Sequence, residues 1–442
     1  MSEPLLVLQA ERRLPPAHLP SVLAAGTPRR ALSLRANFSW TFAGNVVFAG
    51  CQWGILMVLA KLGNPLMVGQ YALGLAITAP VIMLCNLQLR GVLATDARET
   101  YRFGTYLALR VWTTAAALVA ILVIAVAARY QRETALVVVA VGLAKAVESI
   151  SDIAYGFQQH HEQMDRIARS MMLRGVVALV AMGLGIYMTG SVLVGCAGVV
   201  AGWAAVLFGY DLRSSKASMH EIMAVRRTPL ALCSLAWTAA PLGIVMMLSS
   251  LNVNIPRYVI QHYAGERSLG LFAAVAYTMV AGTTVVGALG QSASPRLAQY
   301  YADGQIAQFY SLMRNLLAVG ALLGLAGVTV AVTLGRMILS VLFRFEYVTA
   351  VDVLSWMMAA AAISYLASFF GYGLTAARQF KVQAPLFAVV CASVVVASFI
   401  LVPHFALVGA AWATITGAVI QLVGSAAAMI RALSQRTEES AQ

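Results

Sequence analysis

Residues 105–128 read TYLALRVWTTAAALVAILVIAVAA, with Arg110 as the single charged side chain. A helix of that length crosses a hydrocarbon core about 30 Å thick. Eleven further apolar runs of similar length occupy residues 37–61, 66–88, 134–157, 170–188, 192–211, 230–258, 269–290, 310–334, 351–376, 382–401 and 407–430. The pattern predicts an all-α polytopic membrane protein with 12 transmembrane helices.

The composition supports a membrane protein and excludes several other classes. Of the 442 residues, 60% are hydrophobic and 11% are charged, compared with about 25% charged residues in soluble domains. The mean hydropathy is +0.80. The sequence contains no phosphate-binding glycine loop and no H-E-x-x-H metal motif, so we expect a transporter rather than an enzyme, with no resident cofactor or metal.

Basic residues predict how the chain is oriented. Most of the 30 lysines and arginines fall in the two tails and in alternate loops, and such segments stay cytoplasmic. We therefore predict a cytoplasmic (inner) membrane location with both termini cytoplasmic. The predicted parts are a tail at 1–35, a six-helix lobe at 36–212, a linker at 213–228, a second lobe at 229–431 and a tail at 432–442. The net charge of +13 then reflects topology and attraction to membrane lipids, not nucleic-acid binding.

Two landmarks recur at nearly the same interval. Tyr155-Gly156 is matched by Tyr372-Gly373, 217 positions later, and Leu193-Val194-Gly195 by Leu407-Val408-Gly409, 214 positions later. Six crossings per copy give both copies the same orientation in the membrane. We predict two pseudo-symmetric six-helix bundles around a central cavity, with alternating access by rocking of one bundle against the other.

Three charged residues lie inside the predicted fourth helix. Lys145, Glu148 and Asp152 are spaced by three and four residues and share one helix face. A charge at the bilayer centre costs at least about 2.5–3.5 kcal/mol, so this face is turned away from lipid. One interpretation is a structural Lys145–Glu148 pair. The other is a cavity wall on which Lys145 binds an anionic substrate and Glu148 or Asp152 takes up a coupling H⁺ or Na⁺.

Other polar residues within the predicted crossings leave similar alternatives open. Arg110 and Arg174 either extend to the lipid headgroups or add cations to the same lobe. Asn45 and Gln52 share a face of the first helix and suit either sugar hydroxyls or interhelical hydrogen bonds. Arg257, beside Pro256, lies either at an irregular cavity edge or in an ordinary interfacial anchor.

The chain resembles a known family, most clearly in its second half. Three stretches are similar to bacterial polysaccharide and O-antigen type oligosaccharide flippases. They are LNVNIPRYVIQHYAGERSLGLFAAVAYTMVAGTTVVGALGQSASPRLAQYYADG at 251–304, YGFQQHHEQMDRIARSMMLRG at 155–175 and VLFRFEYVTAVDVLSWM at 341–357. These belong to the multidrug, oligosaccharidyl-lipid and polysaccharide exporter superfamily. The likeness spans most of the chain, and its motifs are diffuse patterns rather than a catalytic signature.

The resemblance implies transport of an undecaprenyl-diphosphate-linked oligosaccharide to the outer leaflet. By analogy, Lys145, Arg110, Arg174 and Arg257 would bind the diphosphate and Asn45 and Gln52 the sugars. Glu148 and Asp152 would serve coupling to H⁺ or Na⁺, with the membrane potential as another driving force. A polysaccharide polymerase and a chain-length regulator are the implied partners. The strongest competitor is a multidrug cation antiporter of the same superfamily, which would favour acidic and aromatic groups for its substrates.

Overall fold

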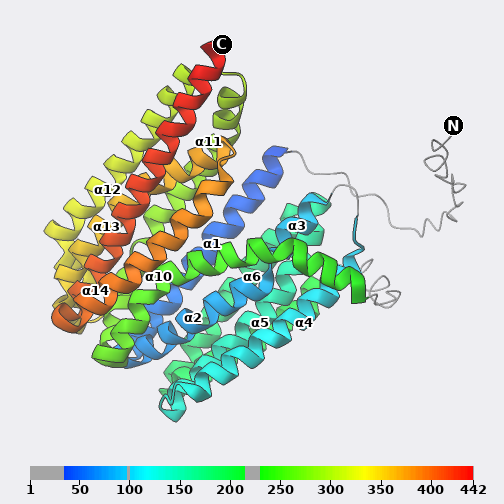
Figure 1. The fold of residues 1–442 in the computed structure, drawn as a ribbon. Coiled ribbons are helices and arrows are strands. Elements are labelled where there is room, and N and C mark those ends of the chain that lie inside the picture. The colour runs from blue at the N-terminus through cyan, green and yellow to red at the C-terminus, as the bar shows by residue number, and fades with distance from the viewer. Residues whose placement is uncertain (1–33, 97–99, 215–228, 442) are drawn as a thin grey trace, which may run out of the picture.

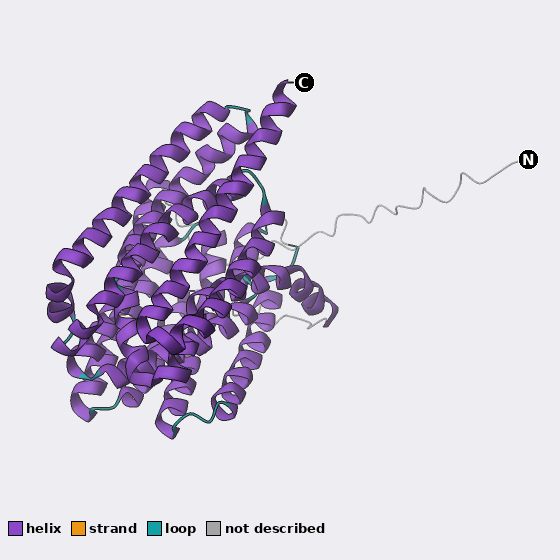
Figure 2. Ribbon diagram, turned by 60° about the vertical axis from the view of Figure 1, so that its left-hand side comes forward, coloured by secondary structure: helices purple, strands orange, loops and turns teal. Residues whose placement is uncertain are grey.

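Figure 1 shows the computed structural model, which describes residues 34–96, 100–214 and 229–441. Helices dominate these ranges, and Figure 2 shows no strand in them. The first half contains α1 (Leu34–Leu62), α2 (Pro65–Asn86), α3 (Leu89–Thr95), α4 (Phe103–Ala127), α5 (Arg132–His160), α6 (Met164–Thr189), α7 (Val192–Val206), a π-helical turn η1 (Leu207–Asp211) and α8 (Leu212–Ser214). The second half contains α10 (Pro229–Tyr277), α11 (Val280–Ala302), α12 (Ile306–Leu342), the 3₁₀ helix η2 (Phe345–Ala350), α13 (Val351–Ala376) and α14 (Phe380–Ala441).

The helices agree with twelve crossings. Ten helices in the described ranges are long and apolar enough to span a membrane. Two of the ten, α10 and α14, each consist of two helices joined at a kink. The kink lies at the non-helical residue Gly265 in α10 and at Ala406 in α14. Each therefore supplies two crossings, the second crossing of α10 continuing into α11. The predicted twelve-span, all-α fold is confirmed.

Several predicted boundaries moved outward. Helix α12 covers 306–342 rather than 310–334, and α14 continues to Ala441, beyond the predicted tail boundary at 431. Apolar runs mark only the part of a helix that lies in hydrocarbon, so polar turns beyond it were missed. Helix α10 also passes through Pro256 without a break. The predicted tail up to residue 33 and most of the predicted linker, 215–228, lie outside the described residues.

Left-handed residues at helix ends repeat with the same period as the sequence landmarks. Gly190 ends α6 with φ 66°, and Ala406 interrupts α14 with φ 47°. Glu162 separates α5 from α6 with φ 55°, and Arg378 separates α13 from α14 with φ 57°. Both pairs are 216 positions apart, and three of the four residues carry a Cβ that disfavours this conformation. The equal spacing supports the two-copy architecture.

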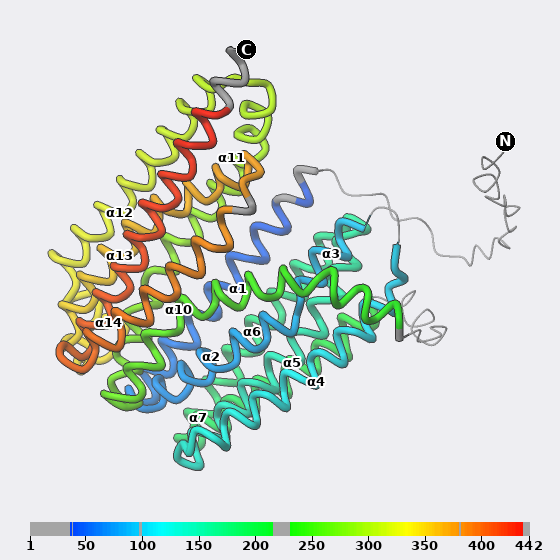
Figure 3. The backbone as a smooth tube through the Cα atoms, in the orientation of Figure 1, coloured from blue at the N-terminus to red at the C-terminus, as the bar shows by residue number. Residues whose placement is uncertain are grey.

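The two groups of helices meet at one end and diverge toward the other (Figures 1 and 3). In the first lobe α1 packs on α6, and α5 packs on α2, α4 and α7; in the second, α13 packs on α11, α12 and α14. Helix α10 crosses between the lobes and packs extensively on α2. The diverging end carries the C-terminus, so it is the end that the basic residues predict to be cytoplasmic.

The start of α10 packs on the first lobe near the predicted cytoplasmic end, and other contacts between the lobes lie at the predicted outer end. Arg344 Nε donates a hydrogen bond to the Lys61 carbonyl oxygen at 3.0 Å, and Thr134 Oγ1 donates to Glu266 Oε1 at 2.7 Å. Gly69 and Gly270 allow the backbones of α2 and α10 to touch, since a Cβ on either would lie 1.8 Å from a backbone carbonyl oxygen of the other helix. With the predicted orientation, this arrangement closes the outer side. The lobes diverge on the other side, apart from the packing of α10 on the first lobe, which is an inward-facing arrangement.

Replacing Gly69 with leucine is expected to separate the lobes at the outer end, because the new side chain would overlap the Glu266 carbonyl. Spin labels on cysteines at the exposed positions Leu62 and Thr349 report this separation. We expect a longer-distance population in the Gly69→Leu protein. Gly50→Leu is the control, because a Cβ at Gly50 meets no atom within 4 Å. An unchanged distance in the Gly69→Leu protein would show that the glycine contact does not hold this end closed.

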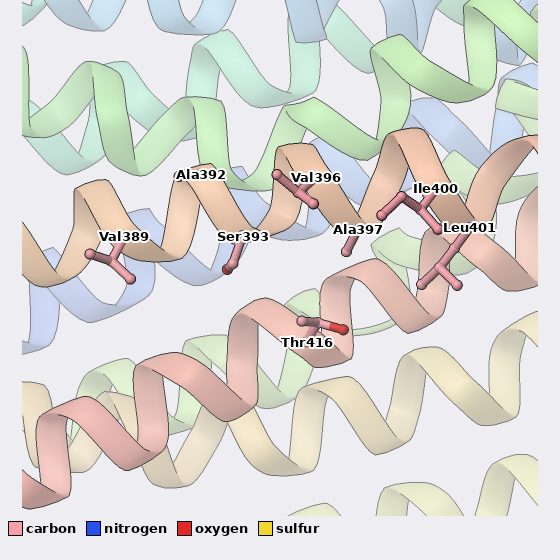
Figure 4. Close-up of a pocket in the computed structure, with 8 residues that line it drawn as sticks. All are labelled: Val389, Ala392, Ser393, Val396, Ala397, Ile400, Leu401 and Thr416. Carbon is pink, nitrogen blue, oxygen red and sulfur yellow. The ribbon is translucent and has the colours of Figure 1, made fainter.

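The outward faces of the lobes are apolar and suit lipid. Val119, Val123 and Val126 on α4 and Leu322 and Leu325 on α12 are strongly exposed, which in water would favour aggregation. The two segments of α14 also border an apolar groove of about 570 Å³ whose lining Figure 4 shows. Its two hydroxyls, on Ser393 and Thr416, donate to carbonyls of their own helix, so the groove offers no polar group and fits hydrocarbon chains.

Candidate functional site: a charged cluster inside the first lobe

Helix α5 carries the predicted charged face into the interior of the first lobe. It packs against α2, α4, α6 and α7, so its charged residues face protein and not bulk lipid. Lys145 Nζ lies 2.7 Å from Glu148 Oε2, one turn away. Both side chains keep slightly more than a quarter of their surface accessible, which leaves the pair reachable by water or ligand from one side.

The Trp203 ring of α7 lies close to two cationic side chains, Lys145 and Arg174. Its ring centre lies 5.8 Å from Lys145 Nζ and 4.5 Å from Arg174 Cζ. The indole Nε1 also donates to the Arg174 carbonyl oxygen at 3.1 Å. A tryptophan face stabilises a nearby cation by about 0.5–2 kcal/mol. Trp203 therefore helps to hold two positive charges close together within the membrane.

Asp152 belongs to a second group of charges. Its carboxylate lies 3.2 Å from Arg110 NH2 and 3.3 Å from Arg90 NH1. Arg90 Nε also donates to Gln159 Oε1 at 3.1 Å. Asp152 thus shares a helix face with Lys145 as predicted but is paired with arginines from α3 and α4.

Arg110 and Arg174 do not extend to the lipid headgroups. Their exposed fractions are 0% and 2%, so both side chains lie inside the first lobe and do not snorkel. Their binding of an anionic substrate stays a prediction. Sequence position suggested snorkelling because both residues lie near a predicted helix end, whereas the partners that hold them inside come from other helices. Two guanidinium nitrogens on each have no acceptor among the described residues, which leaves donors for an anion that reaches them after a rearrangement.

A hydroxyl chain connects Arg174 to a buried carboxylate. Arg174 NH1 donates to the Tyr155 hydroxyl at 3.3 Å, Tyr155 and Ser170 share a 2.6 Å hydrogen bond, and Ser170 Oγ donates to Asp211 Oδ1 at 2.5 Å. Asp211 is fully buried and lies on the π-helical turn η1, a distortion that often accompanies functional positions.

We call the seven charged residues described above the lobe-1 cluster: Arg90, Arg110, Lys145, Glu148, Asp152, Arg174 and Asp211. It contains four cations and three carboxylates. Sequence reasoning missed Arg90 and Asp211 because both fall at predicted helix ends and resembled ordinary topogenic or loop charges. The described residues contain no group of three or more histidine, cysteine, aspartate or glutamate side chains that could hold a metal ion.

Arg257 is on α10, the helix of the second lobe that packs on α2 of the first lobe. Its NH1 donates to Asn254 Oδ1 at 2.9 Å, and the next residue, Tyr258, donates its hydroxyl hydrogen to the Ala76 carbonyl oxygen of α2. Tyr277 is within electrostatic range of both Arg257 and Tyr71, and Tyr71 is within range of Glu148. Arg257 therefore lies on regular helix next to a residue that contacts the first lobe, which excludes the irregular backbone of one of the two interpretations.

The two amides predicted on α1 do not contact the lobe-1 cluster. Asn45 is exposed, and its Nδ2 donates to the Thr41 carbonyl of its own helix at 2.8 Å. Gln52 is half-buried, and its Nε2 has no acceptor among the described residues. Their proposed contact with sugars stays a prediction.

Comparisons with known proteins agree on the type of molecule. No protein-family model matches the chain. The capsular polysaccharide biosynthesis protein CapF of Staphylococcus aureus is 25% identical over 380 residues, which cover 85% of this chain and 94% of CapF. The lipid II flippase MurJ in an inward closed conformation matches with a TM-score of 0.71 at 11% identity over 92% of this chain and 90% of MurJ. An inward-facing multidrug resistance transporter of the MATE family matches at 0.70 and 11%, over 90% of this chain and 98% of that one.

Two repeated six-helix lobes that meet at one end and hold charges within the membrane define a multi-pass membrane protein with the fold of known transporters. The chain shares its fold with the MATE-family transporter of the multidrug, oligosaccharidyl-lipid and polysaccharide (MOP) superfamily and with MurJ, and its sequence is similar to that of the capsular polysaccharide biosynthesis protein CapF. The resemblance noted in the sequence is thereby confirmed.

Proposed function

We propose that this protein moves undecaprenyl-diphosphate-linked oligosaccharide units from the cytoplasmic to the outer leaflet of the inner membrane, for synthesis of a cell-surface polysaccharide. The observation that carries the proposal is the cation-rich lobe-1 cluster. A diphosphate headgroup needs cations in a low-dielectric site, and arginine forks hold phosphate oxygens through paired hydrogen bonds. A carrier of cationic drugs would need the opposite balance.

The headgroup path begins at the splayed end, which is open toward the predicted cytoplasm. Lys145 lies about 16 Å along α5 from Thr134, given a rise of 1.5 Å per residue, and Thr134 forms part of the closed outer contact. The Lys145–Glu148 pair therefore lies about halfway along α5. Tyr71 of α2 belongs to the same lobe, whereas Arg257 and Tyr277 are on α10. In this proposal Lys145 and Arg257 receive the diphosphate from opposite lobes, and the lipid tail stays outside in hydrocarbon.

Exchange of ion partners offers a way to couple transport to an ion. Lys145 is held by Glu148, and Arg110 by Asp152. Uptake of H⁺ or Na⁺ by either carboxylate would weaken its hold on the cation and free that cation for an anionic headgroup. The membrane potential would act on the same charges. Arg174 and Arg110 would then contribute their unused N–H donors once the lobe rearranges.

The competing function is a multidrug cation antiporter, which the similarity to the MATE-family structure favours equally by fold. Another superfamily member of this fold, from Pyrococcus furiosus, is described as having a binding pocket of reverse polarity; it matches at a TM-score of 0.58 and 12% identity, over 91% of this chain and 95% of that one. Substrate charge therefore has to be measured. A polymerase and a chain-length regulator remain proposed downstream partners, since a flipped repeat unit needs to be joined to others.

Deleting the gene from its host tests the proposal. Polyprenyl-diphosphate oligosaccharides, extracted with lipids and identified by mass spectrometry, are expected to accumulate because their export is blocked. The intact gene should reverse the accumulation. An unchanged lipid pool together with new sensitivity to cationic drugs would favour the antiporter.

A further inference from the structure

A second groove, separate from the lobe-1 cluster, lies on the outward face of the second lobe. It is an open groove of about 800 Å³ between α12, α13 and α14. Its described lining is apolar apart from Arg314, with Leu317, Ala321, Leu366, Phe370 and Leu422 among the contributors. The groove faces outward from the second lobe, away from the first.

The position of Arg314 fixes which end of the groove is polar. Arg314 lies on the turns of α12 nearest its start, and Ala321 lies about 10 Å further along the helix axis. On α14 the lining runs from Leu422 to Ile430, which is followed by the exposed Arg431. Both arginines are thus at the end predicted to be cytoplasmic. The groove extends from there about two thirds of the way through one leaflet, whose hydrocarbon is about 15 Å thick.

Arg314 has no counter-charge in the described part of the chain. It is exposed, and no carboxylate lies within ion-pairing distance of it among the described residues. Tyr310, one turn earlier on the same face, is 51% exposed. Tyrosines of this kind lie at headgroup level. Arg314 is therefore one turn below that level, where its side chain reaches a lipid phosphate.

We propose that this groove is a binding site for an anionic phospholipid of the cytoplasmic leaflet, with one acyl chain along α12, α13 and α14 and the headgroup phosphate on Arg314. Basic pockets between transmembrane helices on the cytoplasmic side favour anionic headgroups. The groove is too apolar for the sugar or diphosphate of the transported unit, and it lies outside the space between the lobes. The site therefore binds a resident lipid whatever the transported substrate is.

Native mass spectrometry of the purified full-length protein tests this site with phosphatidylglycerol and phosphatidylcholine of identical acyl chains. We expect one phosphatidylglycerol to be retained about five-fold more strongly than phosphatidylcholine, because the attraction of one cation to an anionic headgroup corresponds to about that ratio of affinities. Arg314→Ala should remove this preference, and Ala321→Trp, which fills the groove, should lower retention of both lipids. Arg336→Ala, at the other end of the same helix, is the matched control and should behave as the unaltered protein.

Equal retention of the two lipids by the unaltered protein, or an Arg314→Ala protein that behaves as the Arg336→Ala control, would overturn the proposal. So would displacement of phosphatidylglycerol by polyprenyl phosphate at a lower concentration, since the groove would then belong to the substrate. Circular dichroism of each variant shows whether the helices are intact. The readout is lipid binding alone, so it does not depend on whether the protein flips an oligosaccharide.

Discussion

Replacing Asp152 with asparagine is expected to lower the free energy of unfolding by about 3 kcal/mol, the lower end of the cost of breaking a buried ion pair. The guanidinium of Arg110 is fully buried, and Asp152 is the carboxylate paired with it. Neutralising Asp152 leaves that charge in a low-dielectric interior without compensation. Arg90 loses its ion pair as well, but it is one-third exposed and can be solvated.

The measurement is the thermal or denaturant unfolding midpoint of the purified protein in one detergent. The double variant Arg110→Met with Asp152→Asn should recover most of the loss, because methionine fills a similar volume without a charge. Asp165→Asn is the matched control, since its pair with Arg169 spans 3.7 Å and Arg169 is 54% exposed; an exposed pair contributes at most about 1 kcal/mol. Equal midpoints for Asp152→Asn and Asp165→Asn would show that Arg110 does not depend on Asp152.

Replacing Lys145 with alanine is expected to reduce transport at least ten-fold while leaving most of the protein folded. Folding tolerates the change because Glu148 stays within electrostatic range of Arg174. Transport does not tolerate it if Lys145 binds the diphosphate, because loss of one charge-assisted contact costs about 1.5–3 kcal/mol, and ten-fold corresponds to 1.4 kcal/mol. Lys145→Arg should retain part of the activity.

The double variant Lys145→Ala with Glu148→Ala distinguishes a binding cation from a structural pair. Removing both charges leaves no unpaired partner, so a purely structural pair would tolerate the double change. We expect normal protein levels without recovery of transport. Lys61→Ala is the control, because Lys61 is exposed at the outer end. Full transport by the double variant would refute the role of Lys145 in binding, and accumulation of the lipid-linked intermediate in cells provides the readout.

Apolar periodicity and repeat spacing were enough to predict the fold. Twelve runs of hydrocarbon length permit little besides helices, and a period near 216 residues appears in the sequence landmarks and in the backbone at Gly190 and Ala406. Helix ends were less predictable, since polar turns continue past the membrane core, as in α12. The break at Ala406 falls between the predicted crossings 382–401 and 407–430, but its positive φ could not be predicted from residue type, because alanine rarely adopts that conformation.

The sequence predicted which site residues share a face of one helix, but not which residues of different helices contact one another. Spacing on α5 correctly placed Lys145, Glu148 and Asp152 on one face, because that relation depends on local geometry alone. Which charges pair across helices depends on packing, so the Arg110 and Arg90 contacts to Asp152 were not foreseen. Trp203 also escaped notice, since an aromatic residue in an apolar run usually indicates ordinary packing.

Transport by the purified protein in liposomes tests the central claim most directly. A fluorescent polyprenyl-diphosphate oligosaccharide on one leaflet is converted by an impermeant enzyme or reagent only after it crosses to the other. The account predicts conversion that depends on the protein, is strongly reduced by Lys145→Ala and is unaffected by Lys61→Ala. Absence of crossing, together with uptake of a cationic dye driven by an H⁺ or Na⁺ gradient, would contradict it.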